Sequence, residues 1–327
     1  MSQPLRLPAG LHFDVPAAAY HADPAPEPSL SSSMAKVLLD QSPRHAWHQH
    51  PRLNADMPAA ADPTRQKEIG TAVHKLVLGR GADIVEIDAA DFKGGAAKAA
   101  RAEAYALGKA PILKPDMEKA RAIGDAVAAQ LSAIDGCEGF DAGAPEVVGL
   151  CRDATGSWLR CMIDKFEDHG ERAVLWDLKS GDLSAEPGTL GRRIANMSFE
   201  VSAALYERVV LTLRPALAGR LTFRWIFVEN EFPHLITVSE LDNAGLEIGR
   251  KKVAAANALW NRCLRDNNWP GYPARIVGAE YPPFAESAWL ARELADETIR
   301  DAGMDPFLMR APWQPPRPQR QLSEIAP

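Results

Sequence analysis

Three short strand-like runs follow one another between residues 145 and 180, and no other feature constrains the fold as much. The runs are PEVVGLC, SWLRCMIDKF and AVLWDLKS, and the polar sequences RDATG and EDHGER separate them. Short runs rich in Val, Leu, Ile and Trp, bounded by Gly and Asp, are typical of strands joined by tight turns. The sequence therefore predicts a three-stranded antiparallel meander.

Helical patterns surround this meander. SLSSSMAKVLLDQSP begins with capping serines, and RQKEIGTAVHKLVLG places apolar residues on one helical face and ends at a glycine. Residues 187–214 and 243–265 also have helical patterns, and two further strand-like runs, LTFRWIFVEN and HLITVSEL, lie between them. This order of helices and strands predicts α/β layering around a central mixed sheet.

The composition favours one large domain with extensions. The chain has 327 residues, and 46% of them are hydrophobic, which is enough for a sizeable core. We expect an irregular arm over residues 1–30 and a body over residues 31–300. Within the body, the Ala-, Lys- and Glu-rich segment 95–133 is expected to form two solvent-facing helices, broken near its prolines. The Pro-rich tail, residues 301–327, is expected to be disordered.

Charge and cysteine spacing limit the possible functions. A net charge of −6 argues against a uniformly basic surface, although it neither supports nor excludes DNA binding in a local groove. The four cysteines form no CxxC pair, which disfavours a zinc or iron–sulfur site. Because no apolar run could span a bilayer and no N-terminal leader pattern is visible, we expect a cytoplasmic protein with no membrane partner.

Two acids and a lysine lie on neighbouring strands of the predicted meander. Side chains alternate faces along a strand, so Asp177 and Lys179 should point the same way. A turn centred on residues 169–171 would place Asp164 roughly opposite Asp177. A slip of one residue in this register would turn Asp164 away.

Such a pair of carboxylates favours a divalent metal ion. Two acids this close repel each other unless a cation lies between them. Hard oxygen ligands favour Mg²⁺ or Mn²⁺, and a metal-bound water beside a lysine can attack phosphorus. The alternative is that the acids and the lysine are the polar trim of a hairpin, because D-x-K tripeptides arise by chance. Charges at the ends of buried strands are costly unless paired, which favours the metal site.

The pattern around these residues resembles a known superfamily. MID, then thirteen residues further on DLK, with GTAVH on a helix before them and AALY on a helix after them, is similar to the PD-(D/E)xK nucleases. The resemblance is to the phage-type exodeoxyribonuclease VIII (RecE-like) group, which is related to the nuclease domain of RecB. It extends through WPGY, over most of the chain. It implies a restriction-endonuclease-like α/β/α core with helical extensions.

The resemblance implies roles for individual residues. Asp164 and Asp177 match the two metal-binding acids, and Lys179 matches the catalytic lysine. The backbone carbonyl of Leu178 would be a further metal ligand. His74 of GTAVH matches the helix histidine that approaches the metal. A lone histidine at the edge of an apolar face can also be purely structural.

Other matches are partial. Glu146 matches an acid that often begins the first strand of the meander, and we hold it only as an accessory candidate. The family helix commonly carries Gln-x-x-x-Tyr, whereas this chain has Ser202 in place of the glutamine and keeps Tyr206. Arg192 and Arg193, expected at the start of that helix, are candidate phosphate contacts, and an exposed helical turn explains them equally well.

The implied function is a Mg²⁺-dependent deoxyribonuclease that digests linear duplex DNA from an end in the 5′ to 3′ direction. The resemblance also implies phage-type homologous recombination in a bacterial or phage-infected cell, a single-strand annealing protein as partner and a homo-oligomeric ring. Three alternatives stay open: an endonuclease of the same superfamily, an iron–sulfur nuclease, against which the missing cysteine cluster argues, and a non-catalytic DNA-binding or assembly module of the same fold. The intact acids and lysine argue against the last.

Overall fold

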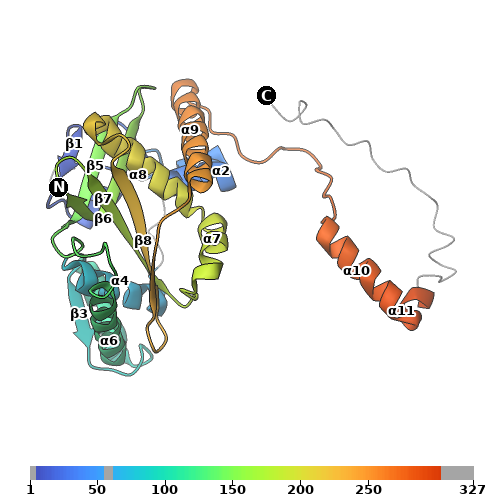
Figure 1. The fold of residues 1–327 in the computed structure, drawn as a ribbon, viewed down its shortest axis with the longest axis horizontal. Helices are drawn as coiled ribbons and strands as arrows, with labels where there is room; N and C mark the ends of the chain where they lie inside the picture. The colour runs from blue at the N-terminus through green and yellow to red at the C-terminus, as the bar shows by residue number, and fades with distance from the viewer. Residues whose placement is uncertain (1–4, 55–61, 303–327) are drawn as a thin grey trace. The chain divides into compact units, whose positions relative to one another are not determined.

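The computed structural model describes residues 5–54 and 62–302, and the chain divides into two units, residues 1–272 and 273–327. The first unit is built on a mixed β-sheet (Figure 1). The predicted meander is present, and its third strand pairs in parallel with the next strand along the chain. In sheet order the strands are β1 (Gly10–His12), β5 (Ala144–Arg152), β6 (Trp158–Asp168), β7 (Ala173–Gly181), β8 (Leu221–Glu229) and β9 (Ile236–Ser239), with β2 (Leu30–Ser31) beside β6.

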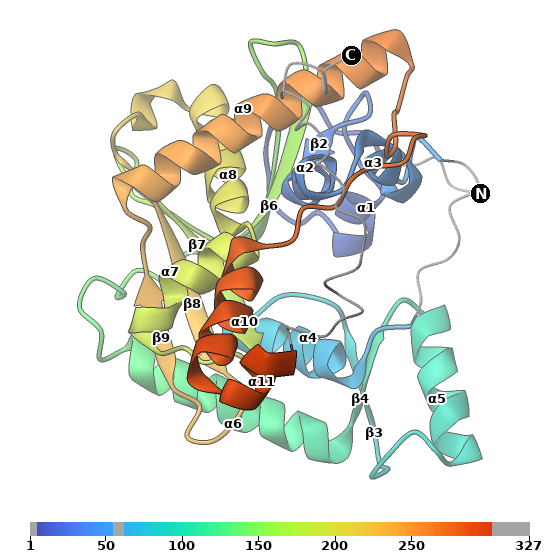
Figure 2. The same ribbon diagram turned by 90° about the vertical axis from the view of Figure 1, so that its right-hand side faces the viewer.

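Helices cover both faces of this sheet. One hydrophobic core joins β6, β7 and β8 to α2 (Ser32–Asp40), α8 (Phe199–Leu213) and α9 (Asn243–Asp266). A second core joins β7 and β8 to α4 (Arg65–Leu78) and α6 (Lys114–Leu131). Figure 2 shows α9 lying along α8. The predicted α/β layering around a central mixed sheet is therefore confirmed. The remaining helices of this unit are α1 (Ala17–His21), α3 (Pro43–Gln49), α5 (Gly95–Ala106), α7 (Pro187–Asn196) and a 3₁₀ turn (Pro215–Leu217).

Helix boundaries follow the capping signals of the sequence. Ser31 begins α2, and its hydroxyl accepts a hydrogen bond from the Met34 amide at 3.3 Å. Thr64 caps α4 in the same way, and Gly79 ends that helix in the left-handed conformation that glycine adopts without strain. In the described residues, no helix is long and apolar enough to cross a membrane.

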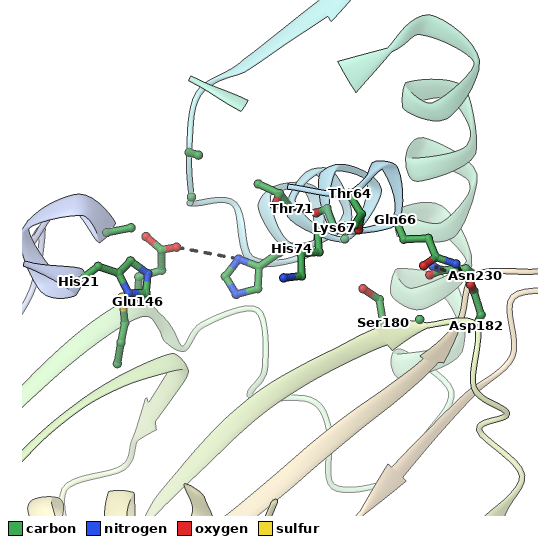
Figure 3. A pocket seen from close by; sticks show the side chains of 16 residues that line it. His21, Thr64, Gln66, Lys67, Thr71, His74, Glu146, Ser180, Asp182 and Asn230 are labelled. Carbon is green, nitrogen blue, oxygen red and sulfur yellow. Dashed lines mark hydrogen bonds and ion pairs between the residues drawn. The ribbon is translucent and has the colours of Figure 1, made fainter. Parts of the chain in front are cut away.

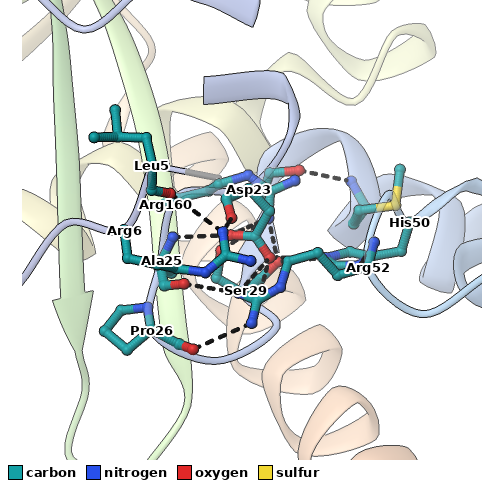
Figure 4. A network of polar contacts seen from close by, with 11 residues as sticks. Leu5, Arg6, Asp23, Ala25, Pro26, Ser29, His50, Arg52 and Arg160 are labelled. Carbon is teal, nitrogen blue, oxygen red and sulfur yellow. Dashed lines mark hydrogen bonds and ion pairs between the residues drawn. The ribbon is translucent and has the colours of Figure 1, made fainter. Parts of the chain in front are cut away.

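Residues 5–30 lie against the body and are more regular than the irregular arm that the sequence predicted. Strand β1 pairs antiparallel with β5, and β2 pairs in parallel with β6. A buried polar network fastens the segment between them: Asp23 accepts hydrogen bonds from the amide and hydroxyl of Ser29, and its carboxylate lies 3.4 Å from the Arg160 guanidinium (Figure 4). The prolines and alanines of this segment show no helical or strand periodicity. Its structure depends on contacts with distant strands, which the sequence pattern does not report.

The segment 95–133 also differs from its prediction. It does contain two helices, α5 and α6, but β4 (Ala110–Leu113) lies between them and pairs in parallel with β3 (Ile84–Ile87). Helix α6 faces solvent on one side only, because its other side buries a stripe of apolar residues that belongs to the second core: Met117, Ala120, Ile123, Val127 and Leu131. The high Ala, Lys and Glu content concealed this narrow stripe.

The compact body ends earlier than predicted. The first unit stops at Tyr272, and the expected boundary at residue 300 falls inside the second unit. That unit contains α10 (Pro283–Ala295) and α11 (Glu297–Ala302), in which no described residue is buried. The first two residues of the expected disordered tail belong to α11, and residues 303–327 lie outside the described residues.

Candidate active site

A fork in the sheet sets the position of the candidate site. The β6–β7 ladder runs from Asp168 to Lys165 of β6 and stops one position before Asp164 and Asp177. Nearer the start of β6, Leu159 and Arg160 pair with β2 in place of β7. Strand β5 pairs with the other edge of β6. Strands β6 and β7 therefore separate at the two acids, and β2 with the start of α2 enters the fork.

Strands β5 and β6, which are paired with each other, are both distorted next to Asp164. Glu146 of β5 lies opposite Asp164 in the register but is absent from the pairing, and its φ of 50° is left-handed. Such a conformation costs a non-glycine residue about 1–3 kcal/mol and persists only where surrounding structure imposes it. Ile163 and Phe166, three residues apart on β6, pack in the same core, whereas alternation would put them on opposite faces. Strand β6 therefore switches faces next to Asp164.

Asp164 is held by two partners. Its Oδ2 accepts a hydrogen bond from the Leu178 amide at 2.8 Å, and its Oδ1 lies 3.3 Å from Nε2 of His74. Burial on its own would raise the pKa of this carboxyl, but His74, Lys179 and the Leu178 amide together hold it below its usual value. Asp164 is therefore ionised at neutral pH. The β6–β7 register, extended by one position beyond the Lys165–Trp176 pair, sets Asp164 opposite Asp177, as predicted.

Asp177 and Lys179 form an ion pair on one face of β7, as alternation predicted. Asp177 is buried, and its Oδ2 faces the ammonium yet accepts no hydrogen bond of good geometry. Burial, followed by the negative charge of Asp164, raises the pKa of Asp177 despite the attraction of Lys179. The pKa of Lys179 is also raised, because the two carboxylates outweigh the effect of burial. Both shifts point to an excess of negative charge at the fork, which a cation would relieve.

His74 reaches the site from α4 and lies between two acids. Its Nδ1 is 3.9 Å from Oε1 of Glu146, and the second oxygen of that carboxylate lies 3.6 Å from Nε of Arg80 (Figure 3). Burial lowers the pKa of His74, but Asp164 and Glu146 reverse the effect, so the imidazole is protonated more readily than usual. The sequence singled out both His74 and Glu146. Arg80 was missed, because it follows the end of α4 with no motif of its own.

A cavity of about 770 Å³ opens beside this histidine. As Figure 3 shows, Lys67, Thr71 and His74 of α4 line one side, and Ser180 and Asp182 from the end of β7 line another. Its volume falls in the range of small-molecule and cofactor sites. The cavity therefore gives a substrate access to the residues at the edge of the fork.

The donor atoms fit a hard divalent cation, although the side chains form no closed cage. Within the described part of the chain, no group of three His, Cys, Asp or Glu side chains is placed to hold a metal ion. Mg²⁺ needs only one or two carboxylates and keeps several waters. The Oδ2 of Asp177 accepts no hydrogen bond of good geometry and, apart from its ion pair with Lys179, is available as a ligand atom beside Asp164. The Leu178 amide points toward Asp164 of β6. In a β-strand the carbonyl of a residue points to the same edge as its amide, so the Leu178 carbonyl also points toward β6.

The remaining predicted residues make no hydrogen bond or ion pair with this group in the described structure, although Tyr206 lies within reach of the charges of Asp164 and Asp177, and Arg193 within reach of Lys179. Tyr206 is buried against the Phe223 ring, and Ser202 is buried on the same helix. Arg192 and Arg193 lie near the end of the separate helix α7, not at the start of α8. Arg192 is exposed, and Arg193 donates hydrogen bonds to the carbonyls of Leu183 and Ser184.

Comparisons with known proteins give little further information. No family model matches the chain, and no curated protein matches it in sequence. Among solved structures, it is similar to one from Eubacterium rectale described as a "Putative exonuclease", with a TM-score of 0.49 and 11% identity over 80% of this chain and 93% of the other. A likeness this weak assigns no activity to the chain, so the function is argued from the geometry of the fork.

Proposed function

We propose that the protein is a Mg²⁺-dependent deoxyribonuclease that hydrolyses phosphodiester bonds at the fork between β6 and β7. The observation that carries this proposal is the group formed by buried Asp177 and partly buried Asp164 and Lys179 at the point where the two strands separate. Such a group lowers the stability of the fold, because burying charge is costly and Oδ2 of Asp177 accepts no hydrogen bond of good geometry. A bound cation would offset this cost. Sites of this kind are where perturbed pKa values gather.

Each residue has a separate task in this proposal. Asp164 and Asp177 would hold the cation, together with the Leu178 carbonyl. Bound Mg²⁺ or Mn²⁺ would supply an acidic water and a positive charge next to the phosphate. Lys179 stabilises negative charge that develops on the phosphorus oxygens. His74 holds Asp164 in place from the α4 side and would help to hold the cation.

The finer features of the proposal rest on the resemblance to the RecE-like nucleases. These are the 5′ to 3′ direction on linear duplex ends, the setting of phage-type recombination in the cytoplasm of a bacterial or infected cell, a single-strand annealing partner and a homo-oligomeric state. Against an iron–sulfur nuclease, the four cysteines are buried as free thiols. They also belong to no metal-binding group among the described residues.

Linear and covalently closed duplex DNA, each incubated with Mg²⁺ or with chelator, test the proposal. We expect Mg²⁺-dependent digestion of linear DNA, and a loss of roughly 10²-fold or more in rate for Asp177→Asn, which weakens a proposed metal ligand, and for Lys179→Met, which removes a positive charge at the reacting phosphate. Asp168→Asn is the matched control, since this acid lies on β6 away from the fork and pairs with Arg214. Circular dichroism verifies that each variant is folded.

The same assay separates the rival functions. Undiminished hydrolysis by Asp177→Asn or Lys179→Met would sink the site assignment. Equal cutting of closed circles would identify an endonuclease. Retention of DNA without hydrolysis under any metal condition would favour the DNA-binding or assembly module.

A further inference from the structure

A second lysine lies at the same fork, on an element that the acidic motif does not include. Lys36 belongs to α2, which begins directly after β2 enters the fork beside β6. Its Nζ lies 5.1 Å from the centre of the Phe199 ring, and Nζ of Lys179 lies 5.2 Å from the centre of the same ring. One aromatic side chain at the start of α8 therefore places both ammonium groups beside the site.

The charges around Lys36 are not balanced by a direct partner. Among the described residues, no carboxylate lies within ion-pair distance of its ammonium, whereas Lys179 is paired with Asp177. Glu200, on the neighbouring turn of α8, already pairs with Lys252 at 2.5 Å. Burial, and then the like charge of Lys179, lower the pKa of Lys36 to about 8.

A structural role explains this arrangement only in part. The Phe199 ring attracts an ammonium through its π face, and the aliphatic stem of a lysine packs well on apolar surface. Neither effect favours two ammonium groups at one ring, because like charges repel. An anion between or beside them would remove this cost, and a phosphodiester strand supplies one anion per nucleotide.

We propose that Lys36 binds a backbone phosphate of the substrate strand next to the reacting phosphate that Lys179 would contact. This assignment rests on the proposed function for the identity of the substrate. It makes Lys36 a substrate-binding residue that reads no base, because a lysine–phosphate contact carries no sequence information. Helix α2 would then contribute a phosphate-binding residue to the site, whose acids come from β6 and β7.

The test measures binding without hydrolysis. The full-length wild type, Lys36→Met, Lys36→Arg and Lys251→Met are titrated against a short fluorescein-labelled DNA duplex with Ca²⁺ in place of Mg²⁺, between about 50 and 200 mM salt. Met keeps the length of the side chain and removes its charge, and Arg keeps the charge. Lys251 is an exposed lysine of α9 near Glu247 and serves as the matched control.

For Lys36→Met we expect affinity to fall roughly tenfold at the lowest salt concentration, with a plot of log affinity against log salt that is shallower by about one. Lys36→Arg should keep the wild-type slope, and Lys251→Met should keep both slope and affinity. A merely structural lysine would change stability without changing the slope. A Lys36→Met slope equal to that of wild type would overturn the assignment, as would a wild-type protein that binds no DNA.

The two proposals fail in different ways in this experiment. If the wild type binds duplex DNA but never hydrolyses it with Mg²⁺, the nuclease proposal fails, and the slope still decides the role of Lys36. If hydrolysis is normal and the slopes agree, only the Lys36 assignment fails. Thermal unfolding of each variant, followed by circular dichroism, excludes loss of the fold as the cause of weaker binding.

Discussion

Among single residues, Asp23 carries a fully buried negative charge in a left-handed backbone conformation with a φ of 61°. Its carboxylate lies 3.3 Å from His50, 3.7 Å from Arg52 and 3.4 Å from Arg160. These partners come from the α3 region and from β6, so one side chain joins three distant parts of the chain. Burial alone would raise the pKa of Asp23, but His50, Arg160 and Ser29 lower it below its usual value.

We expect Asp23→Asn to lower the free energy of unfolding by roughly 3–5 kcal/mol, because the substitution leaves the buried Arg160 without its counter-charge. Urea unfolding measures the loss. Asp266→Asn, at an exposed pair with Arg265, should change stability by less than about 1 kcal/mol. A loss at Asp23 no larger than that at Asp266 would contradict the network's role.

The lowered pKa of Asp23 also sets a pH dependence. A carboxyl with a lowered pKa in the folded state stabilises the protein fully above its unfolded value, and the contribution disappears as pH falls through the lowered value. The difference in unfolding free energy between the wild type and Asp23→Asn should therefore be constant near neutrality and shrink only in acid. A difference that grew in acid would contradict this sign.

At the scale of elements, the contact between α8 and α9 leaves no room for a side chain at Gly249. A Cβ built there would lie 2.5 Å from the Glu200 carbonyl oxygen, and 3.0 Å from its carbon. Because these are backbone atoms, they cannot rotate away, and the helices would have to separate. Trp260 and Val253 of α9 belong to the core that this separation would open.

We therefore expect Gly249→Ala to destabilise the protein by about 1–3 kcal/mol, even though alanine favours the helix itself. Gly191 of α7 is the matched control, because a Cβ added there would have nothing within 4 Å of it. Gly191→Ala should be neutral or stabilising by up to about 1 kcal/mol. Urea unfolding of both variants provides the comparison, and equal effects at the two glycines would refute the close packing.

At the scale of the whole molecule, the chain separates into a unit with cores and a unit whose described residues, 273–302, form none. The first unit contains all the described buried hydrophobic residues, the last of which is Trp269. Tyr272 still belongs to it, and its ring lies 5.4 Å from that of His45. In α10 and α11 no residue is buried, and apolar side chains such as Phe284 and Leu294 are exposed.

Truncation after Ala274 should leave the first unit folded, because none of the residues described beyond it, 275–302, is buried. We expect the unfolding temperature to change by less than about 2 °C, measured by far-ultraviolet circular dichroism. Truncation before Trp269, which removes a core residue packed against Trp260, should lower it clearly. A large loss on cutting after Ala274 would show that the second unit contributes to the stability of the first.

The sequence by itself determined the local parts of this protein. Alternation along β7 set Asp177 and Lys179 on one face, turn residues set the register that brings Asp164 opposite, and capping residues set the helix starts. These features depend on neighbours in the chain, so a single sequence reports them. The same local logic failed for residues 1–30 and for α6, where weak patterns are stabilised by contacts with distant strands.

Only the tertiary structure decided how these parts meet. The fork exists because β6 exchanges one partner strand for another, and the face switch beside Asp164 breaks the alternation on which sequence arguments rely. It also brought Arg80 to Glu146 and Lys36 to the ring that Lys179 shares. Charge interactions act through space and not along the chain, which is why residues far apart in the chain came together without any signal in the sequence.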